Sequence, residues 1–211
     1  MNNVKKIAVF ASGRGSNFLK IYENIQKGEV SGEIVCLISD NPQAGAIQFS
    51  KDKLIPFSII SPKHFNTPEE FGEEISKILI QYKVDWIILA GFLKKIPDNV
   101  VSKYSNRIIN IHPALLPAFG GKGMYGIRVH NAVFQSGAKI SGVTVHLVNE
   151  IYDAGPIVMQ EAVDIEECKS PEEIAEKVLK VEHILYSKAV NKIMTTKFEI
   201  VSNRVIFSEN R

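Results

Sequence analysis

Short apolar runs alternate with amphipathic stretches along most of the chain. The runs cover residues 6–11, 33–39, 55–60, 84–90 and 107–111, and several are nearly continuous in Val, Ile and Leu. Such runs are typical of parallel strands that are covered on both faces. Helical patterns lie between them at 16–27, 42–53 and 68–82. The alternation predicts βαβ units around a mostly parallel sheet.

The second half of the chain has a different pattern. It predicts a helix at 125–136, strands at 141–149 and 156–165, a long helix from Ser170 to about Met194, and a final strand within 198–207. Ser170 and Glu173 have capping-box spacing, as do Thr67 and Glu70 at the start of the helix at 68–82. No repeat, low-complexity tract or linker interrupts the chain. We therefore predict one α/β domain over 1–211: a Rossmann-like, mostly parallel twisted sheet with helices on both faces, a C-terminal strand pair and a long helix.

Composition narrows the functional classes. The 211 residues are 45% hydrophobic and 23% charged, as in ordinary globular proteins, and 25 basic against 23 acidic residues give a net charge of +2. That balance argues against a nucleic-acid partner. Cys36 and Cys168 form no C-x-x-C pair, which argues against a metal or redox motif. The first strand leaves no room for a signal peptide, and no apolar run reaches the ~18 residues of a membrane span. We expect a cytoplasmic protein with no membrane partner.

The candidate catalytic groups are Asn110, His112 and Asp153. Asn110 and His112 lie in the run N-I-H-P-A-L-L-P, and Asp153 lies in Y-D-A-G-P. An amide can hold an oxyanion, an imidazole can move a proton, and a carboxylate can keep that imidazole charged. The run contains no Ser or Cys nucleophile, which favours direct acyl transfer between two substrates. The role of Asp153 depends on its distance from His112.

A Gly-rich turn, S-G-R-G-S-N at 12–17, follows the first strand and precedes a helix. Backbone N–H groups at a helix start bind phosphate, although good turn and cap chemistry would also explain the motif. Phe18 replaces the third Gly of a dinucleotide fingerprint. This turn, 91–96 and 110–117 all follow predicted strands, where open parallel sheets bind ligands.

Other polar positions leave alternatives open. His146 lies on the alternating strand and is either a neighbour of the catalytic groups or a packed strand histidine. The Gly-rich loop at 119–126 either closes over a substrate or only connects two elements. No spacing resembles H-E-x-x-H, so we predict no metal.

The motifs together resemble those of the phosphoribosylglycinamide formyltransferases, within the folate-dependent formyltransferase superfamily. The matching segments are S-G-R-G-S-N, L-A-G-F at 89–92, N-I-H-P-A-L-L-P, S-G-V-T-V-H at 141–146 and Y-D-A-G-P. The resemblance covers residues 7 to about 186 and implies the formyltransferase fold. It implies transfer of a formyl group from 10-formyltetrahydrofolate, as co-substrate, to the amine of 5-phosphoribosylglycinamide in purine biosynthesis. We expect a monomer or homodimer.

The resemblance implies roles for individual positions. The ribonucleotide would be bound by Arg14, Gly15, Ser16, Asn17 and Glu182. The formyl-folate would be bound by Phe92, Leu93, Lys94, Lys95, Ile96, Asn110, Asn149, Glu150, Ile151, Tyr152 and Asp153. His112, kept protonated by Asp153, would stabilise the oxyanion. Two positions depart from the family pattern: Pro68 stands where many members have an Arg, and Leu179 stands where a polar residue is usual.

Three rival functions remain at this stage. A methionyl-tRNA formyltransferase would need a nucleic-acid-binding extension and a basic surface. A formyltetrahydrofolate deformylase would use water in place of the amine, and it usually has an N-terminal regulatory domain. A noncatalytic nucleotide-binding module would use the Gly-rich turn and Asp40, but it leaves the Asn110–His112 run unexplained.

Overall fold

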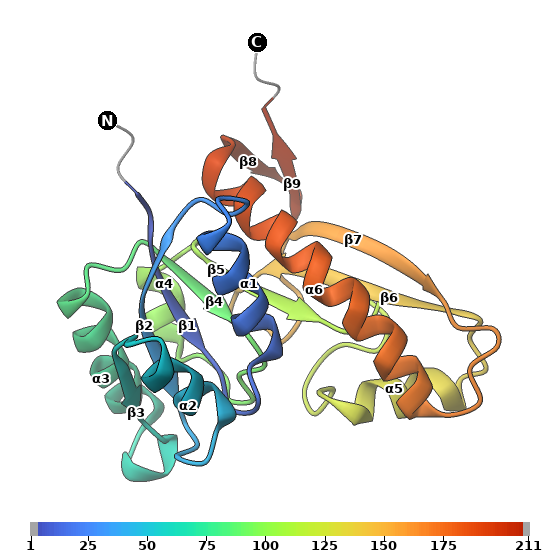
Figure 1. Cartoon of the computed structure of the whole chain (residues 1–211), viewed down its shortest axis with the longest axis horizontal. Helices are drawn as coiled ribbons and strands as arrows, with labels where there is room; N and C mark the ends of the chain where they lie inside the picture. The colour runs from blue at the N-terminus through green and yellow to red at the C-terminus, as the bar shows by residue number, and fades with distance from the viewer. Residues whose placement is uncertain (1–3, 209–211) are drawn as a thin grey trace. The chain divides into compact units, whose positions relative to one another are not determined.

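A computed structural model describes residues 4–208, and its chain divides into two compact units, Met1–Ile109 and Asn110–Arg211. Figure 1 traces both along the chain. The expected single domain over 1–211 stays a prediction. Across the described residues, no helix is both long enough and apolar enough to cross a membrane.

The first unit is built from βαβ repeats. Its elements are β1 (Lys6–Phe10), α1 (Ser16–Gln26), β2 (Glu33–Ser39), α2 (Gly45–Asp52), β3 (Phe57–Ile59), the 3-10 turn η1 (Pro62–His64), α3 (Pro68–Gln81), β4 (Trp86–Leu89) and α4 (Asp98–Lys103). The strands pair in the order β3-β2-β1-β4, and every pairing is parallel. All four residues of β4 are buried, as expected of a strand covered on both faces. The predicted α/β class is confirmed here.

Strand β5 (Ile108–His112) leads into the second unit, which contains α5 (Ile127–Gln135), β6 (Ile140–Leu147), β7 (Ile157–Asp164), α6 (Pro171–Thr195), β8 (Phe198–Val201) and β9 (Arg204–Phe207). Strands β6 and β7 pair antiparallel, and β9 adds to β7 in parallel at Ile157 and Arg204. Helix α6 packs against both β6 and β7, and Figure 1 shows it running along them. Tyr186 on its buried face is fully enclosed.

The predicted caps are confirmed. Thr67 accepts a hydrogen bond from Glu70 N–H at 3.1 Å, and Ser170 accepts one from Glu173 N–H at 3.2 Å. The two glutamates reach back to the backbone one residue before each cap, at Asn66 (2.9 Å) and Lys169 (2.8 Å). These bonds satisfy N–H groups that the first helical turn leaves free.

Some predicted bounds were wrong. The predicted strand at 84–90 begins only at Trp86, because the N–H of Val84 donates to Leu79 O and ends the preceding helix. The tail contains two strands, since Ser202 and Asn203 turn the chain with φ of 46° and 66°. The pattern also missed α4, whose six residues are too short to show helical periodicity.

Candidate active site

Strand β5 places Asn110 and His112 on one side of the sheet, because side chains two residues apart on a strand point the same way. The His112 side chain is buried, while Asn110 is half-buried. His112 Nε2 lies 2.9 Å from the carbonyl oxygen of Phe119. A carbonyl only accepts, so Nε2 must be protonated and donate. The other ring nitrogen, Nδ1, is then the one that can gain or lose a proton.

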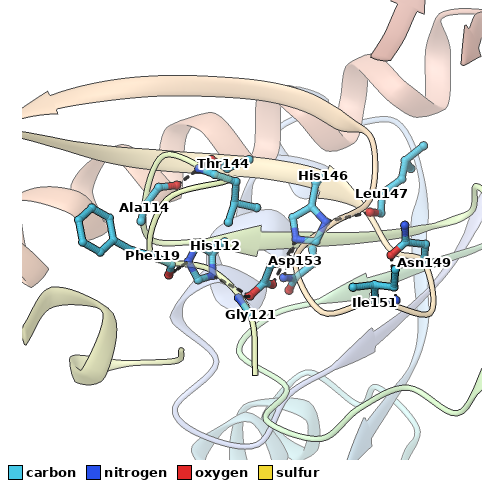
Figure 2. A network of polar contacts seen from close by, with 12 residues as sticks. His112, Ala114, Phe119, Gly121, Thr144, His146, Leu147, Asn149, Ile151 and Asp153 are labelled. Carbon is cyan, nitrogen blue, oxygen red and sulfur yellow. Dashed lines mark hydrogen bonds and ion pairs between the residues drawn. The ribbon is translucent and has the colours of Figure 1, made fainter. Parts of the chain in front are cut away.

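Asp153 lies beside His112. It stands in the loop between β6 and β7 with a φ of 54°, and its Oδ2 lies 3.7 Å from His112 Nδ1. The N–H of Gly121 donates to the same oxygen at 2.9 Å. The loop at 119–126 is thus hydrogen-bonded near its start to both His112 and Asp153. Figure 2 shows Asp153 between His112 and His146.

His146 is the residue that joins Asn110 to this pair. Its Nδ1 lies 2.8 Å from Leu147 O and must donate to it, and its Nε2 lies 3.1 Å from Asn110 Nδ2 and 3.6 Å from Asp153 Oδ1. Of the two roles considered for His146, the structure favours the neighbour of the catalytic groups. The alternation of apolar and polar residues along β6 was the signal that could have identified it, because Thr144 and His146 share a face.

The surroundings of the pair shift both pKa values. Burial lowers the pKa of His112, and the Asp153 charge and the Phe119 carbonyl, which raise it, do not outweigh that effect. Burial raises the pKa of Asp153, but the neighbouring His146 and His112 imidazoles and the Gly121 N–H together bring it below its usual value. The expectation that Asp153 keeps His112 protonated stays a prediction, and the lowered pKa of His112 does not favour it. Burial thus favours the neutral form of His112, whereas the contacts of Asp153 favour its charged form.

Thr144 holds the segment that follows His112. Its buried hydroxyl donates to Ala114 O at 2.7 Å and accepts from Leu116 N–H and from Gln160 Nε2, both at 2.9 Å. Gln160 also donates to Leu116 O at 2.9 Å. The Leu116–Pro117 peptide bond is cis. These buried hydrogen bonds fix the backbone immediately after the candidate catalytic strand.

The Gly-rich turn lies in the first unit, at the start of α1. Gly15 occupies the N-cap position with a φ of 72°, and a Cβ built there would lie 2.9 Å from Ala46 Cβ. Both facts favour glycine. Gly13 and Arg14 are exposed, Ser16 is half-buried and Asn17 is buried. A left-handed residue before a helix start presents successive N–H groups of the kind that bind anions.

The segment at 92–96 is held against the same turn within the first unit. The N–H of Leu93 donates to Ser12 Oγ at 2.9 Å, and the Phe10 and Phe92 rings pack in a T-shaped pair with centroids 5.3 Å apart. Lys94 Nζ lies 3.5 Å from Asp40 Oδ2, and Ser12 Oγ donates to Asp40 Oδ1. Asp40 is therefore paired already. This pairing weakens the alternative of a noncatalytic nucleotide-binding module that uses Asp40.

The remaining predicted binding residues lie in the second unit. Asn149 Oδ1 accepts from Ile151 N–H at 3.1 Å, and Glu150, Ile151 and Tyr152 are exposed between β6 and β7. Glu182 is half-buried on α6. Within residues 4–208, no three His, Cys, Asp or Glu side chains are grouped to hold a metal ion.

Comparison with known proteins identifies the family of the chain. The sequence profile of the family described as "Formyl transferase" matches residues 5–190. Phosphoribosylglycinamide formyltransferase of Bacillus subtilis (strain 168) is 37% identical over 191 residues, covering 90% of this chain and 95% of that protein. The chloroplastic phosphoribosylglycinamide formyltransferase of Arabidopsis thaliana is 44% identical over 98% of this chain and 71% of its own length.

A solved structure gives the same result. The crystal structure of glycinamide ribonucleotide transformylase 1 from Symbiobacterium toebii superimposes with a TM-score of 0.92 at 28% identity, covering 99% of this chain and 96% of the other. The fold, together with the family profile that matches residues 5–190, thus defines a formyl transferase. Within that class, the chain belongs to the phosphoribosylglycinamide formyltransferase family.

Proposed function

We propose that the protein transfers the formyl group of 10-formyltetrahydrofolate to the amine of 5-phosphoribosylglycinamide, as a step of purine biosynthesis. Family membership supports the reaction type. The single observation that carries the proposal is the placement of Asp153 between His112 and His146, with Asn110 bonded to His146. An amide, a titratable imidazole and a carboxylate in one cluster can serve acyl transfer without a covalent enzyme intermediate.

Asn110 and His146 provide the oxyanion contact. With Nδ1 of His146 donating to Leu147, the neutral imidazole has a bare Nε2, which accepts one N–H of the Asn110 amide. The second N–H of that amide is then free for the substrate. When the amine attacks the formyl carbon, the carbonyl electron pair moves to oxygen, and this N–H donates to the oxyanion. Loss of one such donor typically costs ~10²–10³ in rate.

His112 and Asp153 serve the proton transfer from the attacking amine to the folate nitrogen. The attacking nitrogen becomes positively charged in the tetrahedral intermediate and must lose a proton. Neutral His112 accepts it, and the Asp153 carboxylate stabilises the imidazolium. The same proton then passes to the folate nitrogen as its bond to the formyl carbon breaks. The products are the formylated amine and tetrahydrofolate, so the imidazole returns to its neutral form.

Binding roles are assigned by segment. The turn at 12–17, with Arg14, Gly15, Ser16 and Asn17, binds the ribonucleotide phosphate through N–H groups at the start of α1, and Glu182 serves the same substrate. Residues 92–96 and the loop 149–153 bind the formyl-folate. Positioning both substrates supplies much of the remaining acceleration, because orientation alone contributes several kcal/mol. The reaction needs no metal.

The test is a turnover assay with purified protein, 10-formyltetrahydrofolate and 5-phosphoribosylglycinamide, in which release of tetrahydrofolate is followed. We expect release only when the ribonucleotide is present, and a loss of at least ~10²-fold in His112→Ala and in Asn110→Ala. Release without the ribonucleotide would identify a deformylase. The absence of turnover in both cases would overturn the proposal.

Three further assignments accompany the function. The cytoplasmic location stays a prediction, and the Arabidopsis relative is described as chloroplastic. We propose small molecules as the ligands, with neither nucleic acid nor membrane as a partner. We also propose a monomer or homodimer, which a sedimentation measurement tests.

A further inference from the structure

We infer that Asp40 is a positioning residue that couples the Gly-rich turn at 12–17 to the segment at 92–96, so that a ligand at one strengthens binding at the other. The inference rests on the proposed function, which assigns the ribonucleotide phosphate to the turn and the formyl-folate to the segment. All the residues involved lie in the first unit.

Ser12 is the point at which the two segments meet. Its N–H donates to Gly91 O at 3.1 Å, its Oγ accepts from Leu93 N–H at 2.9 Å, and its hydroxyl donates to Asp40. The Ser12 hydroxyl can donate only one hydrogen bond, and it donates this bond to the Asp40 carboxylate. Its oxygen lone pairs are then oriented toward the Leu93 N–H. Ser12 is buried, so these bonds are protected from water. A shift of the turn must therefore move residues 91–93.

Asp40 fixes this arrangement by bonding to both segments. One carboxylate oxygen accepts from Ser12 at the turn, and the other lies 3.5 Å from Lys94 Nζ. The Asp40 side chain is only 8% exposed, whereas that of Lys94 is 39% exposed. A charge held out of water is costly to leave unpaired, so the carboxylate favours the positions of Ser12 and Lys94 that pair it.

The neighbouring residue strengthens the connection. Asn41 Nδ2 donates to Ser12 O at 3.0 Å, and Asn41 is itself held by Ser39, whose Oγ donates to Asn41 O at 3.1 Å. The end of β2 therefore holds both the backbone and the side chain of Ser12. Ser12, Asp40 and Leu93 thus belong to one hydrogen-bonded network. This network orders the proposed phosphate turn and the proposed folate segment together.

Coupling of this kind is reciprocal and appears as a ratio of dissociation constants. The measurement is equilibrium binding of tetrahydrofolate with and without saturating ribose 5-phosphate. For the wild-type protein we expect ribose 5-phosphate to tighten tetrahydrofolate binding by about fivefold or more. Asp40→Asn keeps an oxygen for Ser12 but removes the charge that pairs with Lys94, so we expect the ratio to fall close to one. Lys94→Met should have the same effect.

Asp98→Asn is the matched control. Lys95 Nζ and Asp98 Oδ1 are 2.7 Å apart, but both side chains are well exposed, at 43% and 59%. Exposed pairs contribute little, so this variant should keep the wild-type ratio. Thermal melting of each variant separates lost coupling from lost folding. In turnover, Asp40→Asn should raise the KM for the formyl donor several-fold and change kcat less than twofold.

The outcomes are distinct. A wild-type ratio near one, or a ratio in Asp40→Asn and Lys94→Met within twofold of wild type, overturns the inference. If ribonucleotide-dependent turnover is intact in that case, the proposed function survives. If the wild-type protein neither turns over nor binds tetrahydrofolate, the proposed function fails, and the inference fails with it.

Discussion

The amide nitrogen of Asn110 lies 3.1 Å from His146 Nε2. The opposite nitrogen of the same imidazole donates to Leu147 O, so a neutral His146 can only accept at Nε2. This fixes which way the Asn110 carboxamide is turned. Without His146, the carboxamide could rotate and exchange its N–H group for its oxygen. His146 therefore orients the group that we assign to the oxyanion.

The first prediction concerns this orientation. We expect His146→Ala to lower kcat by about 10-fold or more while the KM values change little, because the lost hydrogen bond acts in the transition state. Asn110→Ala should lower kcat by ~10²–10³. If His146 acts mainly through Asn110, the double variant should be only slightly slower than Asn110→Ala alone.

A double-mutant cycle of kcat checks this prediction. Fully additive losses in the double variant would show that His146 acts independently of Asn110. Because His146 is buried, each variant must first show a cooperative thermal transition. A variant that melts like wild type but is slow has lost orientation and has kept its fold.

The second prediction concerns the pH dependence of kcat. The Asp153 charge raises the pKa of His112 against the larger effect of burial, so Asp153→Asn should lower the pKa of His112 further. If neutral His112 accepts the proton, kcat falls as pH decreases through that pKa. The acidic limb of the profile should then move to lower pH in the variant, and the plateau should fall by ~10² because the imidazolium loses its counter-ion.

The pH profile of kcat with saturating substrates tests the direction in which the acidic limb moves. An acidic limb that moves to higher pH, or that stays in place, would contradict the assignment of His112 as the proton acceptor. Asp98→Asn, which changes an exposed carboxylate elsewhere, should reproduce the wild-type profile.

The sequence was sufficient for the α/β class and for the elements with strong periodicity. Strand β2 has the predicted bounds because its apolar run is bounded by polar residues, and α3 and α6 begin at predicted caps. The two residues Asn110 and His112 could be paired from sequence because a strand places alternate residues on one face.

Contacts between distant segments could not be predicted in the same way. The 3.7 Å approach of Asp153 to His112 and the contact of His146 with Asn110 depend on how β5, β6 and a loop pack together. The lowered pKa of His112 could not be predicted either, because the sequence does not show the burial that outweighs the Asp153 charge. Nor could the sequence show that Asp40, the acid of the nucleotide-binding alternative, is paired with Ser12 and Lys94.

The third prediction concerns Thr144. Thr144→Val keeps the shape of the side chain but removes the hydroxyl that bonds to Ala114, Leu116 and Gln160. Buried polar groups left without a partner cost about 1–3 kcal/mol each, so we expect a loss of roughly 2–4 kcal/mol in the free energy of unfolding. Urea denaturation measures it. Thr144→Ser keeps the hydroxyl and should lose less than half as much, and equal losses would assign the effect to the methyl group.

The fourth prediction concerns stability in acid. Burial, with a smaller contribution from the His112 charge, lowers the pKa of His130 to about 4 from the usual 6.5. Its side chain is buried, and Nδ1 has no hydrogen-bond partner among the described residues. Between pH 6.5 and about pH 4, His130 is therefore protonated in the unfolded chain but neutral in the folded protein. The stabilisation is complete above pH 6.5 and is lost progressively as pH falls toward 4.

A shift of this size corresponds to about 3 kcal/mol of unfolding free energy. His130→Leu removes the titrating group, so its unfolding free energy should fall by about 3 kcal/mol less than that of wild type between pH 7 and pH 4. Urea titrations at both pH values measure the difference, and acidic residues common to both proteins cancel. His64→Gln, at an exposed position on η1, leaves the buried imidazole in place and should lose as much stability as wild type. Equal acid losses in wild type and His130→Leu would show that His130 is accessible to protons in the folded protein.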